Sequence, residues 1–586
     1  MRFELGEHAG AIGAAQRAWE AADTTRRLWS RDASIFSNAD EADWLGWLTL
    51  PDAPLDEAIG PTALREAIAR HPARFVVVLG MGGSSLWPDV LGRTWNARSG
   101  ADRANGATPA RPLHVVDTTV PAGIEALLAG LELEAGLYFV SSKSGSTIEP
   151  NALYALIRAR LDEKLGREAA GRHFVAITDP GSALERVARA EGFLGAALGR
   201  PDVGGRFSAL SVFGNLPALA MGLAPEKLLE RARRMATACG PERSADENPG
   251  IALGLALGTL ARAGRDKLSL SLSPALASFG AWIEQLIAES TGKAGRGLLP
   301  IPDEGLFEPG RYADDRIFVD IALAPTDAHA DADAAERTRR LDALARAGHP
   351  VIRVELADAL ELGAAVFQWE MATAVIGSVL GLNPFDQPDV EAAKQAARER
   401  MASAARGAGA GNDARAAVAR DDIEIFAARA LAAEAGAAGG DPIRLLRSLV
   451  ATLRGGDGFL INAFLADTPA IRARLDRIRR AVGRTKPVAT TLSFGPRYLH
   501  STGQLQKGGS DRLAGLQIWQ AAQRSGVSPF VIPGLGGSFD GLAEAQAAGD
   551  FRILSERGRR MLGIALGDDP EPALDRLIRW LEGALA

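Results

Sequence analysis

Short apolar runs alternate with amphipathic helical segments along most of the chain from about residue 60 onward. Continuous apolar strands separated by helices are typical of a parallel sheet whose two faces are both covered by helices. In the first region the pattern predicts strands at Phe75–Leu79, Leu113–Val116, Leu137–Val140 and Phe174–Ile177. It therefore indicates a doubly wound α/β fold, in which ligands bind at the carboxyl ends of the strands.

The same alternation predicts a second α/β region that starts near Leu268 and follows a helical bridge at about 213–265. Its predicted strands are Leu268–Leu272, Ile317–Ile321 and Val351–Val354. A segment rich in Ala and Gly, 401–418, is interpreted as a linker, and the Gly-, Ala- and Arg-rich stretch 97–111 as a surface loop. The region after the linker is expected to contain a helix near 421–434, strands at Phe459–Phe464 and Val488–Leu492, and terminal helices.

The N-terminal segment differs from the rest because its pattern is helical. Its aromatic residues are expected to pack onto later elements; they are Trp19, Trp29, Trp44 and Trp47. We divide the chain into an N-terminal helical segment (1–55), a first α/β domain (56–230), a second α/β domain that includes the helical bridge (231–405) and a C-terminal α/β region (406–586).

Composition argues against several classes of protein, namely those that bind nucleic acid, contain disulfides or span a membrane. The 586 residues carry a formal net charge of -6, whereas a protein that binds nucleic acid normally carries a basic excess. The single cysteine, Cys239, is expected to be a buried apolar residue, and one cysteine permits no intramolecular disulfide, which fits a reducing compartment. No signal-peptide pattern and no uncharged apolar stretch of about 20 residues are visible, so we expect a cytoplasmic protein without a membrane span.

Glycines and serines follow two predicted strands of the first region. After the strand in VVVLGMGGSSL come Gly82, Gly83 and Ser84, which let the backbone approach a ligand closely. The motif lacks the third glycine of the dinucleotide fingerprint. On its own it fits an ordinary strand–helix turn equally well.

The second turn, in YFVSSKSGSTIEPNAL, carries five hydroxyl side chains within residues 141–147. Ser146 and Glu149 have the spacing of a capping box, so a helix is expected to begin there. Hydroxyl groups, backbone N–H groups and a helix N-terminus that converge on one point suit a phosphate group. The Walker A spacing is absent, which argues against a nucleoside triphosphatase.

Four further motifs contain chemically useful side chains. Arg206, in VGGRFSALS, is of the type that stabilises developing negative charge. Gln285 and Glu289 are four residues apart in QLIAESTGK, so they share a helix face, and the helix breaks directly after Glu289. A carboxylate in that place is a candidate general base. Lys394 follows Pro388 in NPFDQPDVEAAK, and His500 lies in GPRYLHSTGQLQKGG. For each residue alone, a solvated or structural role is at least as common.

Together these motifs resemble the phosphoglucose isomerase family, and most of all the isomerase portion of transaldolase–phosphoglucose isomerase fusions. The resemblance spans residues 70–520. It rests on GMGGSSL, SSKSGST, GGRFSALS, QLIAESTGK and FDQPDVEAAK, which stand in the family's order. Asp389 stands where the family's signature usually has a glycine. The family fold is a pair of flavodoxin-like sugar-isomerase (SIS) domains, which agrees with the doubly wound pattern.

The resemblance implies roles for individual residues. Arg206 would stabilise an enediolate, Glu289 would move a proton between C1 and C2, and Lys394 would assist ring opening. The substrate-binding residues that the resemblance implies are Gly83, Ser84, Ser142, Lys143, Ser144, Ser146, Thr147 and Gln285.

The family's ring-opening histidine usually lies between the glutamate and lysine motifs, but nothing like its surroundings occurs there in this chain. A similar stretch follows the lysine motif instead, and we interpret it as the same element displaced in sequence, which assigns the role to His500. In the family this histidine reaches the partner subunit's active site, which implies a homodimer. The displacement leaves open whether His500 serves its own subunit or the partner's.

The activity implied by the resemblance is the interconversion of glucose 6-phosphate and fructose 6-phosphate in glycolysis and gluconeogenesis, through ring opening and a cis-enediolate. It needs no cofactor, and no His, Asp and Glu grouping has the spacing of a metal site. A bifunctional phosphoglucose/phosphomannose isomerase and a non-catalytic sugar-phosphate sensor are the alternatives. No room remains for a transaldolase barrel of about 250 residues, although a separate transaldolase is a possible partner.

Overall fold

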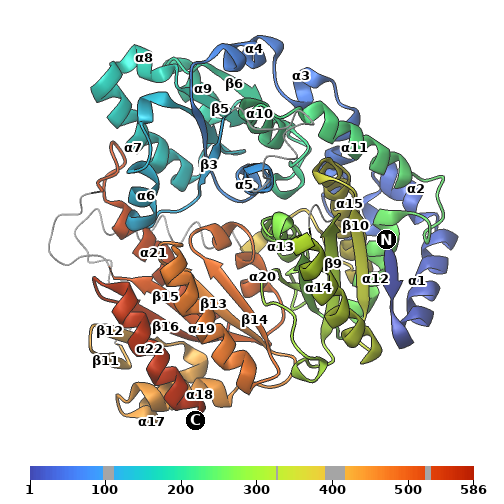
Figure 1. The fold of residues 1–586 in the computed structure, drawn as a ribbon, viewed down its shortest axis with the longest axis vertical. Helices are drawn as coiled ribbons and strands as arrows, with labels where there is room; N and C mark the ends of the chain where they lie inside the picture. Colours follow the sequence, from blue (N-terminus) through green and yellow to red (C-terminus); the bar gives the residue numbers. More distant parts are fainter. Residues whose placement is uncertain (97–110, 325–327, 390–415, 522–529) are drawn as a thin grey trace.

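Three separate sheets organise the computed structural model, which describes residues 1–96, 111–324, 328–389, 416–521 and 530–586. Figure 1 shows them as three lobes, with the C-terminal lobe (orange to red) packed below the first (blue to cyan) and beside the second (green to yellow). The loop expected at 97–111 and the linker expected at 401–418 lie almost entirely outside the described residues. The pair of α/β domains implied by the resemblance is therefore accompanied by a third α/β unit.

The first sheet is fully parallel, with the order β3-β2-β4-β5-β6. Its strands are β2 (Phe75–Gly80), β3 (Leu113–Val116), β4 (Gly136–Ser141), β5 (Phe174–Thr178) and β6 (Gly195–Leu198). Its helices are α4 (Thr62–Arg70), α5 (Leu86–Asn96), α6 (Pro121–Leu128), α7 (Ile148–Leu165), α8 (Arg167–Gly171) and α9 (Ala183–Ala190). All four predicted strands are confirmed. The order reverses between β2 and β4, which makes their carboxyl ends the expected ligand site of a flavodoxin-like sheet.

The second sheet repeats this order in its parallel part, β8-β7-β9-β10. Its strands are β7 (Lys267–Leu272), β8 (Leu299–Ile301), β9 (Arg316–Leu323), β10 (Val351–Leu356) and the antiparallel edge strand β1 (Arg2–Glu4). Its helices are α13 (Phe279–Thr291), α14 (Ala328–Arg346) and α15 (Leu362–Leu380), and the bridge is formed by α10 (Val212–Met221), α11 (Pro225–Ala238) and α12 (Pro249–Arg262). The three predicted strands and the helical bridge are confirmed.

The third sheet has six strands in the order β11-β12-β16-β15-β13-β14. They are β11 (Val418–Arg420), β12 (Ile423–Ala427), β13 (Gly458–Phe464), β14 (Ala489–Phe494), β15 (Leu513–Gln520) and β16 (Arg560–Leu566). The helices are α17 (Ala432–Ala438), α18 (Pro442–Ala451), α19 (Pro469–Thr485), α20 (Gly503–Gly508), α21 (Phe539–Glu556) and α22 (Pro570–Leu585).

The two predicted strands of this region are confirmed as β13 and β14, but the helix expected near 421–434 is wrong. That stretch contains β12, which pairs antiparallel with β16 and alternates side chains between the two faces of the sheet. A short buried strand and a helix cannot be separated by a few apolar residues alone.

The N-terminal segment packs against α12 and α15 through α1 (Ala9–Ala21) and α2 (Thr24–Trp29), whereas α3 (Leu55–Ala58) contacts α10. The fully buried Trp47 lies 5.4 Å from the ring of Phe207 and 5.7 Å from that of Phe367. The Trp29 ring N–H donates to the carbonyl of Cys239, which is itself fully buried. The expectation that these aromatics pack onto later elements is confirmed for both tryptophans.

One helix among the described residues is long and apolar enough by composition to cross a membrane. It covers Ala359–Leu380, and 89% of its apolar window is buried inside the protein. Glycines of α12 pack against it: a Cβ at Gly254 would lie 2.5 Å from Val375. Burial in the core accounts for the apolar character of this helix.

Candidate functional site

The turn after β2 lies where the three lobes meet. A side-chain carbon at Gly83 would lie 1.9 Å from the carbonyl oxygen of Gly205, so this glycine permits contact with the loop that carries Arg206. Gly82 has a positive φ of 54°, and a Cβ there would lie 2.5 Å from the Gln285 amide nitrogen and 2.8 Å from the His500 carbonyl oxygen. The glycines therefore allow parts of all three lobes to approach one short turn.

The hydroxyl-rich loop after β4 is adjacent to this turn at the point where the strand order reverses. Ser142 donates to Thr147 across the loop (3.0 Å), and the Ser144 and Ser146 hydroxyls are 3.1 Å apart. Gly145 adopts a positive φ of 67° at the tip. Helix α7 begins directly after Thr147, whose side chain makes no capping hydrogen bond. The free N–H groups of the first helical turn are thus directed at the loop, an arrangement that attracts anions.

Lys143 is the exception in this loop, because its ammonium group already has partners. It donates to Asp179 (2.5 Å) and to the carbonyl of Arg200 (2.9 Å). Burial raises the pKa of the Asp179 carboxyl, and the bond from Lys143 partly offsets this. A role for the Lys143 side chain in phosphate binding stays a prediction.

The expected capping box does not form, although the helix does begin there. Glu149 is buried and accepts from the side-chain amide of Gln546 in α21 (2.7 Å), while its Oε1 lies 3.0 Å from the His500 Nε2. Burial opposes ionisation of Glu149, but the charge and hydrogen bond of His500 outweigh it and lower the pKa of the carboxyl. The position that resembles a capping residue is in fact an interdomain contact.

Arg206 is buried, with four acceptors around its guanidinium group. Nε donates to Ser290 Oγ (2.7 Å), Nη1 to Gln387 Oε1 (2.9 Å), and Nη2 to the carbonyls of Pro384 (2.6 Å) and Asp386 (3.0 Å). A guanidinium has five N–H donors, so one remains on Nη1. Nη1 lies 3.7 Å from Glu289 Oε1. Burial lowers the pKa of Arg206, and the negative charges of Glu289 and Asp386 oppose this shift.

Glu289 occupies the last turn of α13, one turn after Gln285. The Gln285 amide donates to Glu289 Oε2 (3.2 Å) and also to the carbonyl of His500 (2.7 Å). Both side chains are more than nine-tenths buried. The predicted shared helix face is confirmed, and through Gln285 it links the carboxylate of Glu289 to the backbone of His500.

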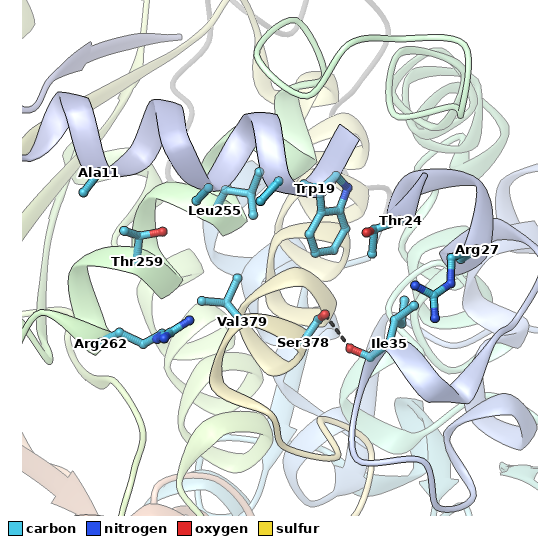
Figure 2. A pocket seen from close by; sticks show the side chains of 12 residues that line it. Ala11, Trp19, Thr24, Arg27, Ile35, Leu255, Thr259, Arg262, Ser378 and Val379 are labelled. Atoms are coloured by element: carbon cyan, nitrogen blue, oxygen red, sulfur yellow. Dashed lines mark hydrogen bonds between the residues drawn. The ribbon is translucent and has the colours of Figure 1, made fainter. Parts of the chain in front are cut away.

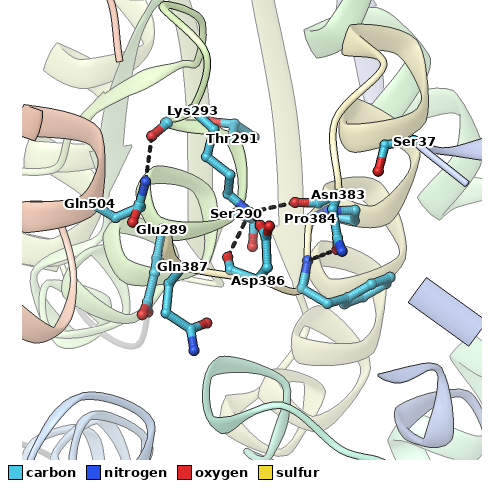
Figure 3. A network of polar contacts seen from close by, with 12 residues as sticks. Ser37, Glu289, Ser290, Thr291, Lys293, Asn383, Pro384, Asp386, Gln387 and Gln504 are labelled. Atoms are coloured by element: carbon cyan, nitrogen blue, oxygen red, sulfur yellow. Dashed lines mark hydrogen bonds and ion pairs between the residues drawn. The ribbon is translucent and has the colours of Figure 1, made fainter. Parts of the chain in front are cut away.

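A second cation, Lys293, fixes the loop that supplies acceptors to Arg206. Its ammonium group donates to the Asp386 carboxylate (2.5 Å) and carbonyl (2.6 Å) and to the carbonyl of Asn383. Burial and the charge of Arg206 lower the pKa of Lys293 to about 8. Figure 3 shows this loop beside the end of α13, with the Glu289 and Gln387 side chains pointing the same way.

The loop continues into the predicted helix start, where Pro388 and Asp389 are helical. Asp389 accepts from the Gln504 amide (2.8 Å) and from Arg557, while its own N–H donates to Gln504 (2.9 Å). Both partners belong to the C-terminal lobe. Lys394, predicted to act a few residues further on, lies outside the described residues.

His500 ends a short turn, Arg497–His500, between β14 and α20. Its imidazole is 14% exposed and faces Glu149 of the first lobe. Of the predicted catalytic residues, the structure thus gathers Glu289, Arg206 and His500 around Gln285 and the turn after β2. Ser84 lies in that turn and is nearly buried.

Sequence reasoning missed several residues that contact this group. Gln387 and Ser290 bind Arg206, Lys293 holds the adjacent loop, and Gln546 binds Glu149. The first three stand inside recognised motifs, so their proximity to named site residues was a usable signal. Gln546 lies in α21 without any motif, and only the docking of the third lobe reveals it.

A separate cavity of about 460 Å³ lies between α1, α2, α12 and α15 (Figure 2). Ser378 donates to the carbonyl of Ile35 at its edge (2.5 Å). Its lining residues include none of the predicted site residues. Within the described part of the chain, no group of three or more His, Cys, Asp and Glu side chains is placed to hold a metal ion.

Comparison with known proteins identifies relatives of this chain. A model of the phosphoglucose isomerase family matches residues 67–296. The glucose-6-phosphate isomerase of Rubrobacter xylanophilus is 33% identical over 372 residues, covering 57% of this chain and 84% of that protein. That of Symbiobacterium thermophilum is 30% identical over 392 residues, covering 60% and 86%. A solved structure of a hypothetical protein from Thermus thermophilus superposes with a TM-score of 0.57 at 26% identity, over 68% of this chain and 99% of that one.

Proposed function

This chain belongs to the phosphoglucose isomerase family, and from that premise we propose that it is an aldose–ketose isomerase that interconverts glucose 6-phosphate and fructose 6-phosphate. The observation that carries the proposal is the pair formed by Glu289 and Arg206. A carboxylate and a guanidinium 3.7 Å apart, both buried and beside a hydroxyl-rich anion loop, suit proton transfer at a carbon next to a carbonyl group.

The phosphate group of the substrate is proposed to bind the loop 141–147. Hydroxyl groups and the N-terminus of α7 would neutralise and orient the dianion. Binding energy from this remote group would position C1 and C2 near Glu289, since energy from non-reacting parts of a substrate can be used for orientation. Gly83 and Ser84 would line the neighbouring side.

The isomerisation itself would be a proton transfer without redox change. Glu289 removes the proton from C2 of the open-chain aldose, and the C2–H electron pair forms the C1–C2 double bond of an enediolate. The charge that develops on the oxygen is stabilised by Arg206, whose remaining Nη1 donor is not used by the four surrounding acceptors. The proton of the C2 hydroxyl passes to the neighbouring C1 oxygen. The electron pair left on the C2 oxygen then forms the C2 carbonyl as Glu289 returns its proton to C1, which gives the ketose.

Ring opening must come first, because hexose phosphates are mostly cyclic. His500 is proposed to move the proton between the O1 hydroxyl and the ring oxygen, together with Lys394. The buried carboxylate of Glu149 supports this role, since a carboxylate bonded to one ring nitrogen fixes the orientation and tautomer of a histidine.

The proposal also includes a cellular location, an oligomeric state and a partner protein. A cytoplasmic location is supported by the single, buried cysteine. The family resemblance supports a homodimer, and the similarity to fusion proteins supports a separate transaldolase as a possible partner. Sedimentation of the purified protein would test the homodimer, and co-purification from its source would test the transaldolase.

The activity is tested by supplying fructose 6-phosphate and detecting glucose 6-phosphate with its dehydrogenase, in the presence of EDTA. We expect turnover in the wild type and a loss of about 10²–10⁴-fold in His500→Ala, the usual contribution of a general acid–base group. A wild type without activity would contradict the proposed function. An active His500→Ala would keep the isomerase and remove His500 from ring opening.

A further inference from the structure

We propose that the C-terminal domain (residues 416–586) completes the active site of the chain that carries it, so that one chain contains its own His500-bearing element. This inference rests on the proposed isomerase activity. The family resemblance predicts a histidine delivered by a partner subunit. In this chain the histidine instead comes from the C-terminal domain of the same chain, which is docked onto the other two domains.

The contacts of His500 carry the first step. Its ring faces Glu149 of the first domain, and its backbone carbonyl accepts from Gln285 of the second. The bare backbone of Gly82 leaves room for that carbonyl, because a side-chain carbon there would approach it to 2.8 Å. One residue of the C-terminal domain is thus enclosed by groups from both other domains of the same chain.

Asp389 supplies an independent second step. It stands where the family signature has a glycine, and its carboxylate is bound by Gln504 and Arg557, both from the C-terminal domain. Gln504 is fully buried and also donates to the carbonyl of Gly292 at the end of α13 (3.0 Å). Asp389 therefore departs from the family pattern and binds the C-terminal domain, which lies outside the residues that the family model matches.

The remaining interface shows that the docking is extensive rather than a single contact. Arg497 forms a two-pronged ion pair with the nearly buried Asp117 (2.6 and 2.8 Å), and Thr119 donates to Gln546 (2.8 Å). On the second domain, Arg479 binds Asp303 (2.6 Å). Apolar residues of the C-terminal domain join the core of the first; they are Phe530, Ile532, Phe539 and Leu542.

Interfaces that bury apolar core residues are held more firmly than the polar, transient kind. A C-terminal domain docked in this way occupies the place that a partner's histidine element would need. In this proposal Glu289, Arg206 and His500 of one active site all come from a single chain, whatever the oligomeric state of the protein.

Disulfide cross-linking tests this docking without relying on enzymatic activity. A Cβ at Gly123 of α6 would lie 4.0 Å from the Cα of Ala466, which follows β13. With the length of one Cα–Cβ bond added, the two Cα atoms are at most about 5.5 Å apart, which lies within the roughly 4–7 Å between Cα atoms in disulfides. The native Cys239 is buried and does not compete. The double variant Gly123→Cys/Ala466→Cys, oxidised at low concentration, should form a bond within one chain and run as a monomer on a non-reducing gel.

Each single-cysteine variant is the matched control and should show no bond. A covalent dimer from the double variant would show that the C-terminal domain docks onto a partner and would overturn the proposal. Absence of any bond in the double variant would contradict the docking itself.

Subunit mixing tests the same claim through catalysis. Glu289→Gln and His500→Ala chains with different tags are co-expressed, and complexes that carry both tags are purified. If each site uses its own chain, every site in the hybrid has one defect, so activity stays at the level of the single variants. If the histidine crosses between subunits, one site per hybrid dimer is intact, and about half of the wild-type activity returns, which would overturn the proposal.

The two experiments separate this inference from the proposed function. An inactive wild type would refute the isomerase, while the disulfide would still report whether the domain docks in its own chain. An active protein that yields no complex carrying both tags works as single chains, which supports the proposal.

Discussion

The parallel part of the third sheet, β14-β13-β15-β16, has the same strand order as β3-β2-β4-β5 of the first, but the two sheets use their carboxyl edges differently. In the first sheet, β2 and β4 end in the glycine and hydroxyl turns that form the candidate site. In the third, Arg497 after β14 pairs with Asp117 after β3, and Ala466 after β13 lies against Gly123. The edge that would normally bind a ligand is covered by the first domain (Figure 1).

The difference teaches that equivalent folds need not have equivalent functions. The first domain provides groups that would contact substrate directly. The third carries His500, for which we propose a catalytic role, and otherwise provides the contacts that hold this residue in place. The Glu289–Arg206 pair is fixed by contacts local to the first two domains, whereas His500 depends on domain docking.

The largest effect is expected at the pair fixed by local contacts. Arg206→Lys keeps the charge but cannot satisfy four acceptors or reach Glu289 in the same geometry, so kcat should fall about 10²–10³-fold. Circular dichroism would establish that the variant is folded. A folded variant with nearly unchanged kcat would separate Arg206 from transition-state stabilisation.

A smaller loss is expected where His500 meets its carboxylate. Glu149→Gln removes a charge-assisted hydrogen bond worth about 1.5–3 kcal/mol, so kcat should fall about 10–100-fold. Because the pKa of Glu149 is lowered in the folded protein, the pair is intact at neutral pH and is lost as pH falls through that pKa. The exposed Glu163 of the same helix gives the control Glu163→Gln, and equal kinetics in the two variants would contradict this role.

Docking of the third domain should respond to Asp389→Gly, which restores the family's usual residue. The variant loses the bonds from Gln504 and Arg557, which we expect to lower the free energy of unfolding by about 1–2 kcal/mol. Urea unfolding measures this. In a double-mutant cycle with Arg557→Ala the effects should not add, and strict additivity would show that the two residues do not interact.

The smallest effect is expected at Glu284 in α13. Burial, assisted by the charge of Asp303, raises the pKa of Glu284 to about 8, while Arg497 opposes the shift. The folded protein therefore keeps a proton that the unfolded chain releases between about pH 4.5 and 8, so this group makes stability fall as pH rises through that window. Glu284→Gln should lose less stability between about pH 5 and 8 in thermal melts, and a parallel pH profile would contradict the assignment.

Much of the fold was predictable because the seven strands predicted in the first two sheets are rich in apolar residues. The short strands β6, β8 and β12 and the edge strand β1 were not predicted, since a few apolar residues do not separate strand from helix. Helical spacing predicted that Gln285 and Glu289 share a face, and the family resemblance added Arg206 to the same site. Glu149 was mistaken for a capping residue, because its partner lies 351 positions away and spacing cannot report such a contact.

The central claim is that Glu289 moves a proton between C1 and C2 through an exchangeable carboxyl group. It is tested by incubating wild type and Glu289→Gln with fructose 6-phosphate in D₂O and following the sugar carbons by NMR. The account predicts that wild type produces glucose 6-phosphate that gains deuterium at C2, and that Glu289→Gln neither converts nor labels the sugar at a comparable rate. Conversion by the wild type without deuterium at C2, or full labelling by Glu289→Gln, would contradict it.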